Sequence, residues 1–408
     1  MKKLTDNSLQ KTITFKLLIA MSSVALTIAF ANASEATLET ISSPAPINSS
    51  LSRVVSDESG QVYLSWVTQE ADLHRLSFAR LTADGWTEPE VIREGNNWFF
   101  NWADFPGLSV NEGNIAAYWL QLSAGGAYDY NIQARFFDAG KNQWSEDSII
   151  HKDGLSAEHG FVSMLPMRSG HTFFSWLDGR ETINDGGAMT LRAGIYDLSG
   201  NLVSNWELDH RVCDCCQTSS AITAVGPIVV YRDRTESEIR DIYYTRYSNG
   251  NWTEPRPIHN DNWQIAGCPV NGPAVSAKDN LVAVSWFTAE DDSPKVQLAV
   301  SDDNGDSFSA PVLVAGPNTN GRVGNVILDS GKIVVSWIDT TEPEAKIVLS
   351  LYSAKGSFIE STNVTITSAS RRSGFPIIKG VGDSVYVTWT DISENPQVKI
   401  ARVNYQGQ

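Results

Sequence analysis

Short runs rich in β-branched and aromatic residues recur along the chain, separated by polar turn residues. Seven of these runs read VYLSW, IAAYW, TFFSW, IVVY, VAVSW, IVVSW and VYVTW, and they end at Trp66, Trp119, Trp176, Tyr231, Trp286, Trp337 and Trp389. This composition, bounded by turn residues, is typical of β-strands. The runs end 51–57 residues apart, and such a regular period indicates an internal structural repeat.

Each copy has similar neighbours. We expect a short strand before the aromatic run, as at Leu51–Ser56, and a third strand after it, as at Leu76–Leu81. A tight turn of Asp, Asn or Gly then leads to a fourth strand, as at Trp86. Four strands in about 50 residues are a propeller blade, which stacks its faces on two neighbouring blades. The sequence therefore predicts an all-β fold, a seven-bladed β-propeller of four-stranded antiparallel blades.

The last copy, Gly374–Gln408, supplies only three strands. Ala36–Ile47 is a β-capable segment with no other assignment. We therefore expect the N-terminal strand to complete the last blade and close the ring, because closure removes open sheet edges.

The first 33 residues have a different pattern. Four lysines precede an apolar run from Leu17 to Phe30, and Ala31-Asn32-Ala33 follows as an A-x-A cleavage site. The run is too short for a transmembrane helix, and no other apolar stretch of about 18 residues exists. We predict a signal peptide over 1–33 and a single propeller domain over 34–408, located in the periplasm or secreted.

Charge narrows the classes of partner. Removing the four lysines and one aspartate of residues 1–33 takes the formal net charge from −16 to −19. This acidity disfavours nucleic acid and anionic membranes as partners. We expect a monomer that binds an anionic glycan or another small anionic ligand.

Two sets of loops share one face of a propeller: those between consecutive blades, and those between the second and third strands of a blade. Sorted in this way, the chain places most of its chemically distinctive residues on that face. The polar residues predicted to bind substrate there are Arg180, Arg232, Arg234, Arg240, Asp241 and Arg322. A guanidinium fork suits bidentate capture of a carboxylate or sulfate, although surface arginines also serve as plain ion-pair partners. Arg232 is singled out because sibling blades carry mostly apolar residues at its position.

The same loops hold aromatic and titratable residues. Trp102 and Trp263 are predicted to stack on sugar rings, with loop packing as the alternative. The predicted catalytic residues are Asp104, His159, Asp178, Glu238 and Tyr128, and Glu158 and Tyr130 lie in the same loops. Histidine is a common general base, so His159 suits that role; the alternative is that it bonds a neighbouring carbonyl. No phosphate-binding loop, dinucleotide fingerprint, G-x-S-x-G or H-E-x-x-H occurs, and we assign no cofactor.

The four cysteines, Cys213, Cys215, Cys216 and Cys268, lie in the two loops that flank the fourth blade. Export favours disulfides, and four cysteines allow three pairings. A vicinal Cys215–Cys216 bond is strained, so we expect Cys268 to pair with one of that couple and Cys213 with the other. A thiolate site for copper or zinc is the competing interpretation.

One turn links the chain to a known family. The stretch from Ser301 to Phe308, SDDNGDSF, resembles the Asp-box of sialidase-type propellers, and weaker copies occur at 83–86 and 248–252. Sialidases have six blades and begin with an Arg-Ile-Pro-like motif that is absent here. The stretches RVCDCCQT, EHGF, WLDGR and GCPVNGP resemble a group of bacterial propellers labelled sialidase-like. The resemblance implies a fold and an exported location.

Three functions remain open at this stage. The first is a glycosidase in which arginines hold an anionic sugar and carboxyl groups act on the glycosidic bond. The second is a lyase of uronic acids, with an arginine neutralising the carboxylate, His159 as base and Tyr128 or Tyr130 as acid. The third is a non-catalytic binding or assembly protein that uses the cysteine cluster.

Overall fold

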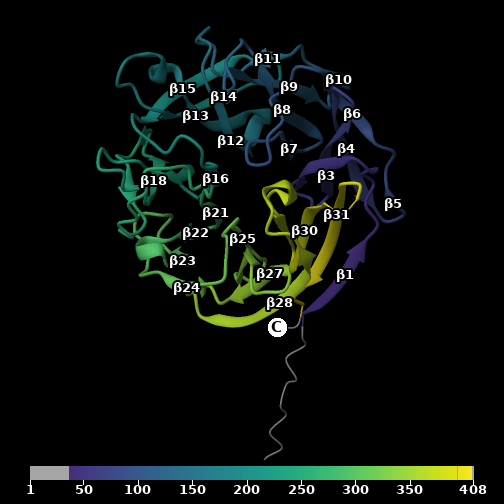
Figure 1. Cartoon of the computed structure of the whole chain (residues 1–408). Coiled ribbons are helices and arrows are strands. Elements are labelled where there is room, and N and C mark those ends of the chain that lie inside the picture. The colour runs from purple at the N-terminus through teal and green to yellow at the C-terminus, as the bar shows by residue number, and fades with distance from the viewer. Residues whose placement is uncertain (1–35, 393, 407–408) are drawn as a thin grey trace, which may run out of the picture.

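The structure, a computed structural model, describes residues 36–392 and 394–406. Seven antiparallel sheets are arranged around a central axis, and the first strand of each blade lies nearest that axis (Figure 1). The prediction of a seven-bladed propeller is confirmed. The predicted signal peptide over 1–33 lies outside the described residues. Within the described residues, no helix is long and apolar enough to cross a membrane.

The blades follow the chain in order. Blade 1 comprises β2 (Ser49–Ser56), β3 (Val62–Glu70), β4 (Leu73–Thr82), β5 (Gly85–Trp86) and β6 (Glu90–Gly95). Blade 2 comprises β7 (Gly107–Asn111), β8 (Asn114–Leu122), β9 (Tyr130–Asp138), β10 (Gln143–Trp144) and β11 (Ser148–Ile149). Blade 3 comprises β12 (His159–Pro166), β13 (Thr172–Asp178), β14 (Thr190–Tyr196) and β15 (Leu202–Asp209). Blade 4 comprises β16 (Ser219–Ile222), β17 (Pro227–Arg232), β18 (Ile242–Ser248), β19 (Asn251–Trp252) and β20 (Arg256–Pro257). Blade 5 comprises β21 (Ala274–Lys278), β22 (Leu281–Thr288), β23 (Lys295–Ser301) and β24 (Val312–Ala315). Blade 6 comprises β25 (Gly324–Ile327), β26 (Ile333–Asp339), β27 (Ala345–Tyr352) and β28 (Phe358–Thr367).

Blade 7 joins the two ends of the chain. It contains β29 (Ile377–Val381), β30 (Ser384–Asp391), β31 (Gln397–Asn404) and, as its outer strand, β1 (Thr37–Ile41). The β1 strand runs antiparallel to β31, with Thr37 opposite Asn404 and Ile41 opposite Ile400. Figure 1 shows purple β1 beside yellow β31. The predicted closure of the ring by the N-terminal strand is confirmed.

The aromatic runs that revealed the repeat form the second strand of each blade, where both faces pack against neighbouring sheets. Trp66, Trp119 and Trp286 are at most 1% exposed. Burial of such large side chains is the main favourable contribution to folding. Because each blade packs only on its neighbours, the core is a ring of apolar layers around the axis rather than a single centre.

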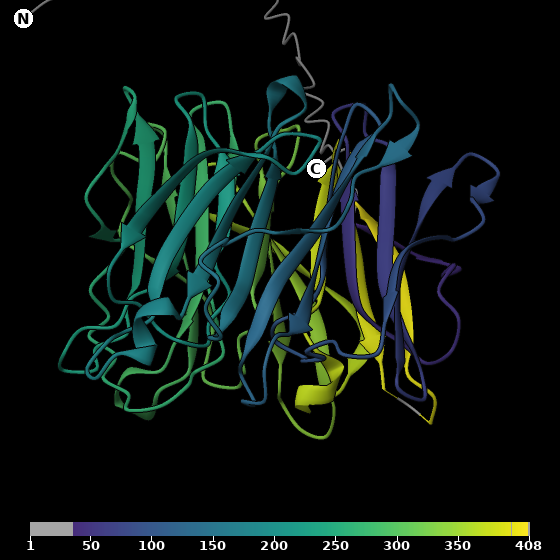
Figure 2. The same ribbon diagram turned by 90° about the horizontal axis from the view of Figure 1, so that it is seen from above.

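The two ends of the ring differ. The Asp-box turn connects β23 to β24, and Asp303 Oδ1 accepts hydrogen bonds from the backbone N–H groups of Asp306 at 2.9 Å and Ser307 at 3.0 Å. Gly305 takes a φ of 77°, which suits glycine. The short 3-10 helices η2 (Arg180–Ile183) and η4 (Arg371–Ser373) project from the other end of the ring (Figure 2). We call that end the loop face.

Candidate functional site

A hydroxyl group links two carboxyl groups on the loop face. The Tyr130 hydroxyl, at the start of β9, lies 2.7 Å from Asp104 Oδ2 and 3.2 Å from Glu158 Oε1. Asp104 Oδ1 accepts a hydrogen bond of 2.8 Å from the Phe161 N–H. The EHGF motif explains the close approach, because a Cβ on Gly160 would lie 1.9 Å from Asp104 Oδ2. Glycine at this position therefore lets two inter-blade loops meet.

Burial changes the protonation of this trio. Asp104 is 2% exposed and Tyr130 is fully buried under Phe99, whose ring stacks on it at 4.0 Å. Burial raises the pKa of Asp104 to about 7. Burial, followed by the charge of Asp104, raises the pKa of Glu158 to about 8. Glu158 is the one partly exposed member of the trio, so it alone can offer a proton to a molecule on the loop face.

An ion-pair network on the loop face joins two arginines to two carboxylates. Arg234 Nη1 lies 2.9 Å from Asp214 Oδ2, and its Nη2 lies 2.8 Å from Glu238 Oε1. Arg240 Nη2 lies 2.8 Å from Glu238 Oε2. Hydrogen bonds from Arg234 and Arg240 lower the pKa of Glu238. The charge of Asp214 also contributes to the raised pKa of Glu158, after burial and the charge of Asp104.

A groove of about 570 Å³ opens on the loop face between blades 7 and 1. Trp102, Phe100 and Arg372 line it together with polar groups that include Asn48 and Gln69. Phe100 is 39% exposed. We call this the Trp102 groove. It combines an aromatic surface with hydrogen-bonding groups, as sugar-binding sites do.

Positive charge gathers at one end of the Trp102 groove. The guanidinium carbons of Arg322 and Arg371 lie 5.0 and 5.7 Å from the centre of the Trp102 ring. Arg371 and Arg372 are exposed, and neither forms an ion pair with any residue that the structure describes. Burial, followed by the charge of Arg371, lowers the pKa of Arg322 to about 10. This end of the groove therefore favours an anion.

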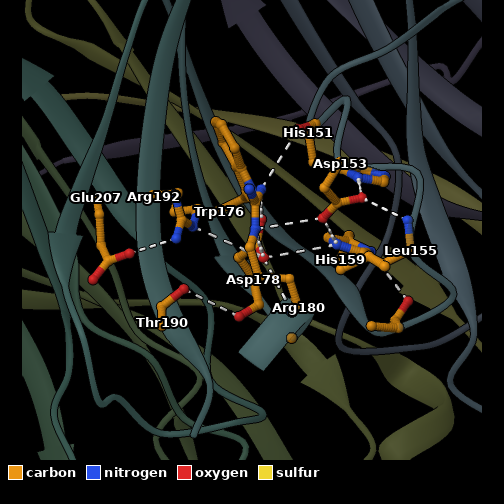
Figure 3. Close-up of polar contacts among 12 residues, drawn as sticks. His151, Asp153, Leu155, His159, Trp176, Asp178, Arg180, Thr190, Arg192 and Glu207 are labelled. Carbon is orange, nitrogen blue, oxygen red and sulfur yellow. Dashed lines mark hydrogen bonds and ion pairs between the residues drawn. The ribbon is translucent and has the colours of Figure 1, made fainter. Parts of the chain in front are cut away.

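Two histidines and two aspartates form a separate, buried cluster between blades 2 and 3 (Figure 3). The rings of His151 and His159 stack at 3.6 Å, and Asp153 binds a nitrogen of each at 2.8 Å. Asp178 accepts two hydrogen bonds of 2.7 Å from the Arg180 guanidinium and another of 2.7 Å from the Trp176 indole.

The histidine cluster is closed to solvent. His159 and Asp178 are fully buried. Burial, followed by the charge of His159, lowers the pKa of His151 to about 4. Hydrogen bonds and charges from Arg180 and neighbours outweigh burial and lower the pKa of Asp178. These groups brace blade 3, and the geometry gives no support to the prediction that His159 and Asp178 contact substrate or that Arg180 holds an anion.

Arg232 also differs from expectation. It is 1% exposed, and its guanidinium donates hydrogen bonds to the carbonyl oxygens of Asn271, Arg240 and Phe287. Trp263 covers it at 5.0 Å. Buried donors need such partners, so Arg232 ties blade 4 to blade 5 and cannot reach a ligand.

Other predicted residues are also occupied within the fold. Asp241 accepts hydrogen bonds from the backbone N–H groups of Asn262 and Trp263. Arg322 is 4% exposed and donates to the carbonyls of Ser370 and Gly374, so it supplies charge to the Trp102 groove without a free fork. Tyr128, by contrast, is 60% exposed, with its ring centre 6.2 Å from that of Phe99.

Three cysteines converge in the loop that leads into blade 4. Cys213 Sγ lies 3.3 Å from Cys216 Sγ and 4.0 Å from Cys215 Sγ, while Cys268 is exposed. No two sulfur atoms in the described residues lie at bonding distance, so the predicted disulfides are not confirmed. Hydrogen bonds with Cys215 and Cys216, together with the charge of Arg240, hold the pKa of Cys213 well below its usual value.

Sequence reasoning missed His151, Asp153 and Asp214. A signal for the first two is present, because Ile150-His151-Lys152-Asp153 recurs as Ile258-His259-Asn260-Asp261 two blades later. His259 Nδ1 lies 2.8 Å from Asp261 Oδ1, as in the first copy. The His-Asp pair therefore recurs with the repeat. Next to blade 3 it is part of a larger cluster that also contains His159 and Asp178. Asp214 lies within the cysteine motif, which drew attention to the thiols alone.

No protein-family model and no curated protein matches the sequence. Among solved structures, the chain is similar to the polysaccharide lyase Uly1, with a TM-score of 0.53 and 9% identity over 87% of this chain and 90% of that one. A puromycin-hydrolyzing peptidase of Mycobacterium tuberculosis gives 0.51 and 10%, over 89% and 52%. The Hadza microbial sialidase Hz136 gives 0.42 and 14%, over 78% and 66%.

The chain thus spans about half of the peptidase's length and just under two thirds of that sialidase's length. Other similar structures are polysaccharide lyases, an arabinanase and further sialidases. At identities this low the likeness extends to the propeller fold, and a fold alone does not define an activity.

Proposed function

We propose that the protein is an exported, carbohydrate-active propeller that binds an anionic glycan in the Trp102 groove and cleaves a glycosidic bond. Glu158 is its proton donor. The observation that carries the proposal is the contact of Glu158 with Tyr130 and, through the same hydroxyl, with Asp104.

The protonation state of Glu158 suits this role. Cleavage of a glycosidic bond needs an acid that still holds its proton near neutral pH. A pKa raised to about 8 keeps Glu158 protonated there. Asp104 and Tyr130 are buried, so we assign them as positioning residues that hold the Glu158 carboxyl in place and do not touch the sugar.

The partner carboxylate is assigned to Glu238. Its pKa is lowered by Arg234 and Arg240, so it is charged when Glu158 is protonated. Pairs of carboxyl groups whose environments push their pKa values apart are typical of acid and base assignments in glycosidases. Asp214 connects the two, because its charge raises the pKa of Glu158 and its carboxylate binds Arg234.

The Trp102 groove is linked to the proton donor through one loop. Trp102 and Asp104 are two residues apart, and the Gln217 side chain donates a hydrogen bond of 2.7 Å to the carbonyl of Ala103 between them. A sugar that contacts the exposed part of Trp102 in the groove is therefore held by the same loop that positions Glu158. Arg371 and Arg372 supply the charge that favours a carboxylated or sulfated sugar.

The lyase mechanism expected from sequence is less well supported. It needs an accessible base, and His159 is fully buried with its Nε2 on Asp153 at 2.8 Å. Glu158, which carries a proton near neutrality, is an acid rather than a base. The geometry therefore favours hydrolysis.

The test is a panel of uronate-bearing and sulfated oligosaccharides with neutral counterparts, analysed by mass spectrometry and ultraviolet absorbance. We expect anionic substrates to give products with one added water and no new absorbance. An unsaturated, absorbing product would instead identify a lyase. Binding without any product would identify a carbohydrate-binding protein, and neither binding nor product would refute the proposal.

A further inference from the structure

The three clustered thiols have the geometry of a metal-binding site. The Sγ atoms of Cys213, Cys215 and Cys216 all lie within 4.8 Å of one another. A tetrahedral cation with bonds of about 2.3 Å to sulfur places its sulfur ligands about 3.8 Å apart. The distances of 3.3 and 4.0 Å from Cys213 lie on either side of this value, whereas a disulfide needs about 2.05 Å.

The fold holds this arrangement from both ends of the loop. The Val212 N–H donates to the Met189 carbonyl at 2.9 Å, and the Cys213 N–H donates to the Arg232 carbonyl at 3.0 Å. At the other end, the Thr218 hydroxyl donates to the Phe161 carbonyl at 2.8 Å. The loop is thus fixed to blades 3 and 4, and the thiols converge because of their backbone anchors.

The surroundings compensate negative charge on sulfur. Arg240 Nη1 lies 3.2 Å from Cys213 Sγ, and such a contact from outside the ligand set stabilises a thiolate ligand. Three thiolates with a divalent cation leave one negative charge, and the Arg240 guanidinium lies next to it while it also contacts Glu238. The Nε of Arg240 is buried and has no hydrogen-bond partner among the described residues.

Access to the cluster is one-sided. Cys213 and Cys216 are each 1% exposed, and Cys215 is partly exposed. A cation therefore enters past Cys215 and is shielded on the other sides. Thiolate ligands favour soft cations such as Cu(I) and Zn(II) over Ca²⁺ and Mg²⁺, which prefer oxygen.

We propose that Cys213, Cys215 and Cys216 bind one thiophilic cation with a filled d shell, Cu(I) or Zn(II), as a three-thiolate site. The site adjoins the network around Glu238, because Arg240 contacts both Cys213 and Glu238, but metal binding itself does not require glycan cleavage. Binding releases the remaining thiol protons to solvent, and no oxidant or reductant is required.

For the test, the cysteines of the full chain are first reduced, and the reductant is then removed under nitrogen. Zn(II) and, separately, Cu(I) are titrated against a competing chelator of known affinity, with metal content and thiolate-to-metal absorbance as readouts. We expect one ion per chain. The cation that the protein holds more tightly against the chelator is the one assigned to the site. Cys215→Ser should weaken binding by about a hundredfold or more, because loss of a direct ligand exceeds the roughly 10–100-fold effect of outer contacts.

Cys268→Ser is the matched control, since Cys268 lies outside the cluster, and it should bind as the wild type does. Because Cys215 is partly exposed, its serine variant should fold, which circular dichroism verifies; Cys216→Ser is a second ligand variant. The proposal is overturned if the reduced wild type binds neither ion, if the ligand variants bind as tightly as wild type, or if Cys268→Ser alone abolishes binding.

Discussion

The hydroxyl oxygen of Tyr130 lies 3.2 Å from Glu158 Oε1 while it also lies 2.7 Å from Asp104 Oδ2. A phenol has one proton and can donate it to only one of these carboxyls. The other contact therefore needs a proton on the carboxyl itself, in agreement with the raised pKa values of both acids. At least one of the two carboxyl groups therefore carries a proton at the loop face.

Replacing Glu158 by Gln removes that proton source and preserves the shape of the side chain. We expect glycan cleavage to fall about 10²–10⁴-fold, the usual contribution of a general acid. In the wild type, activity should decline as pH rises through about 8, where Glu158 loses its proton. Rates across pH 5–10 check both statements. Unchanged turnover in Glu158→Gln would exclude the assignment.

Arg372→Ala should weaken binding of anionic oligosaccharides and leave neutral ones unaffected. The reason is that Arg372 lines the Trp102 groove and has no ion-pair partner among the described residues. We expect KM to rise by about five- to tenfold, with less effect at high salt. Arg402→Ala is the control, because Arg402 is paired with Glu39 on the outer strands of blade 7. Equal effects of the two variants would contradict the groove assignment.

Asp178→Asn should destabilise the fold without touching a ligand. The change leaves the Arg180 guanidinium and the Trp176 indole beside a neutral group in a buried site. Removing one member of a buried ion pair costs about 3–5 kcal/mol, and the partial exposure of Arg180 reduces this to about 2–3 kcal/mol. Urea unfolding measures the loss. Asp185→Asn, at an exposed position, should stay within about 0.5 kcal/mol of wild type.

Stability should depend on pH through His151. Its pKa is about 4 in the folded protein against 6.5 as the ordinary value, so between these values the unfolded chain binds more protons. This contribution to stability is complete above pH 6.5 and is lost as pH falls toward 4, by about 3 kcal/mol. Asp104 and Glu158, with raised pKa values, act in the opposite direction as pH rises.

The His151 contribution is isolated by difference. Wild type and His151→Asn are unfolded with denaturant at several pH values from 4 to 8, and the two stability curves are subtracted. The difference should change between pH 4 and 6.5 and stay flat above pH 7. A difference that is constant over the whole range would show that His151 does not titrate as described.

The blades were predictable because their signal is local. The run ending at Trp66 and its six counterparts predict strands through their residue types and their regular spacing. The last copy, Gly374–Gln408, is one strand short, and Ala36–Ile47 is the segment left to supply its fourth strand. The loop face was also predictable, since loop position follows from strand order. Strand order alone therefore puts Asp104 and Glu158 on the same face, although it does not show that they are linked through Tyr130.

Side-chain direction was not predictable, because it depends on contacts far along the chain. Arg232 is buried by the Phe287 carbonyl and the Trp263 ring, and nothing next to Arg232 in sequence shows this. His159 is likewise enclosed by Asp178 at the end of β13, as well as by Asp153 in the loop that leads into β12. Solvent exposure distinguishes residues that stabilise the contacts between blades from residues that can contact a ligand. Because exposure depends on the assembled ring, the local sequence does not show it.

Closure of blade 7 by β1 also constrains when the fold can form. The pairing of Thr37 with Asn404 joins residues from opposite ends of the chain, and contacts of such long sequence separation form late in folding. A chain emerging from the ribosome cannot complete the ring until its last strand is made. Until β31 is made, β1 has no strand to pair with and blade 7 is incomplete, so open sheet edges remain exposed to edge-to-edge association.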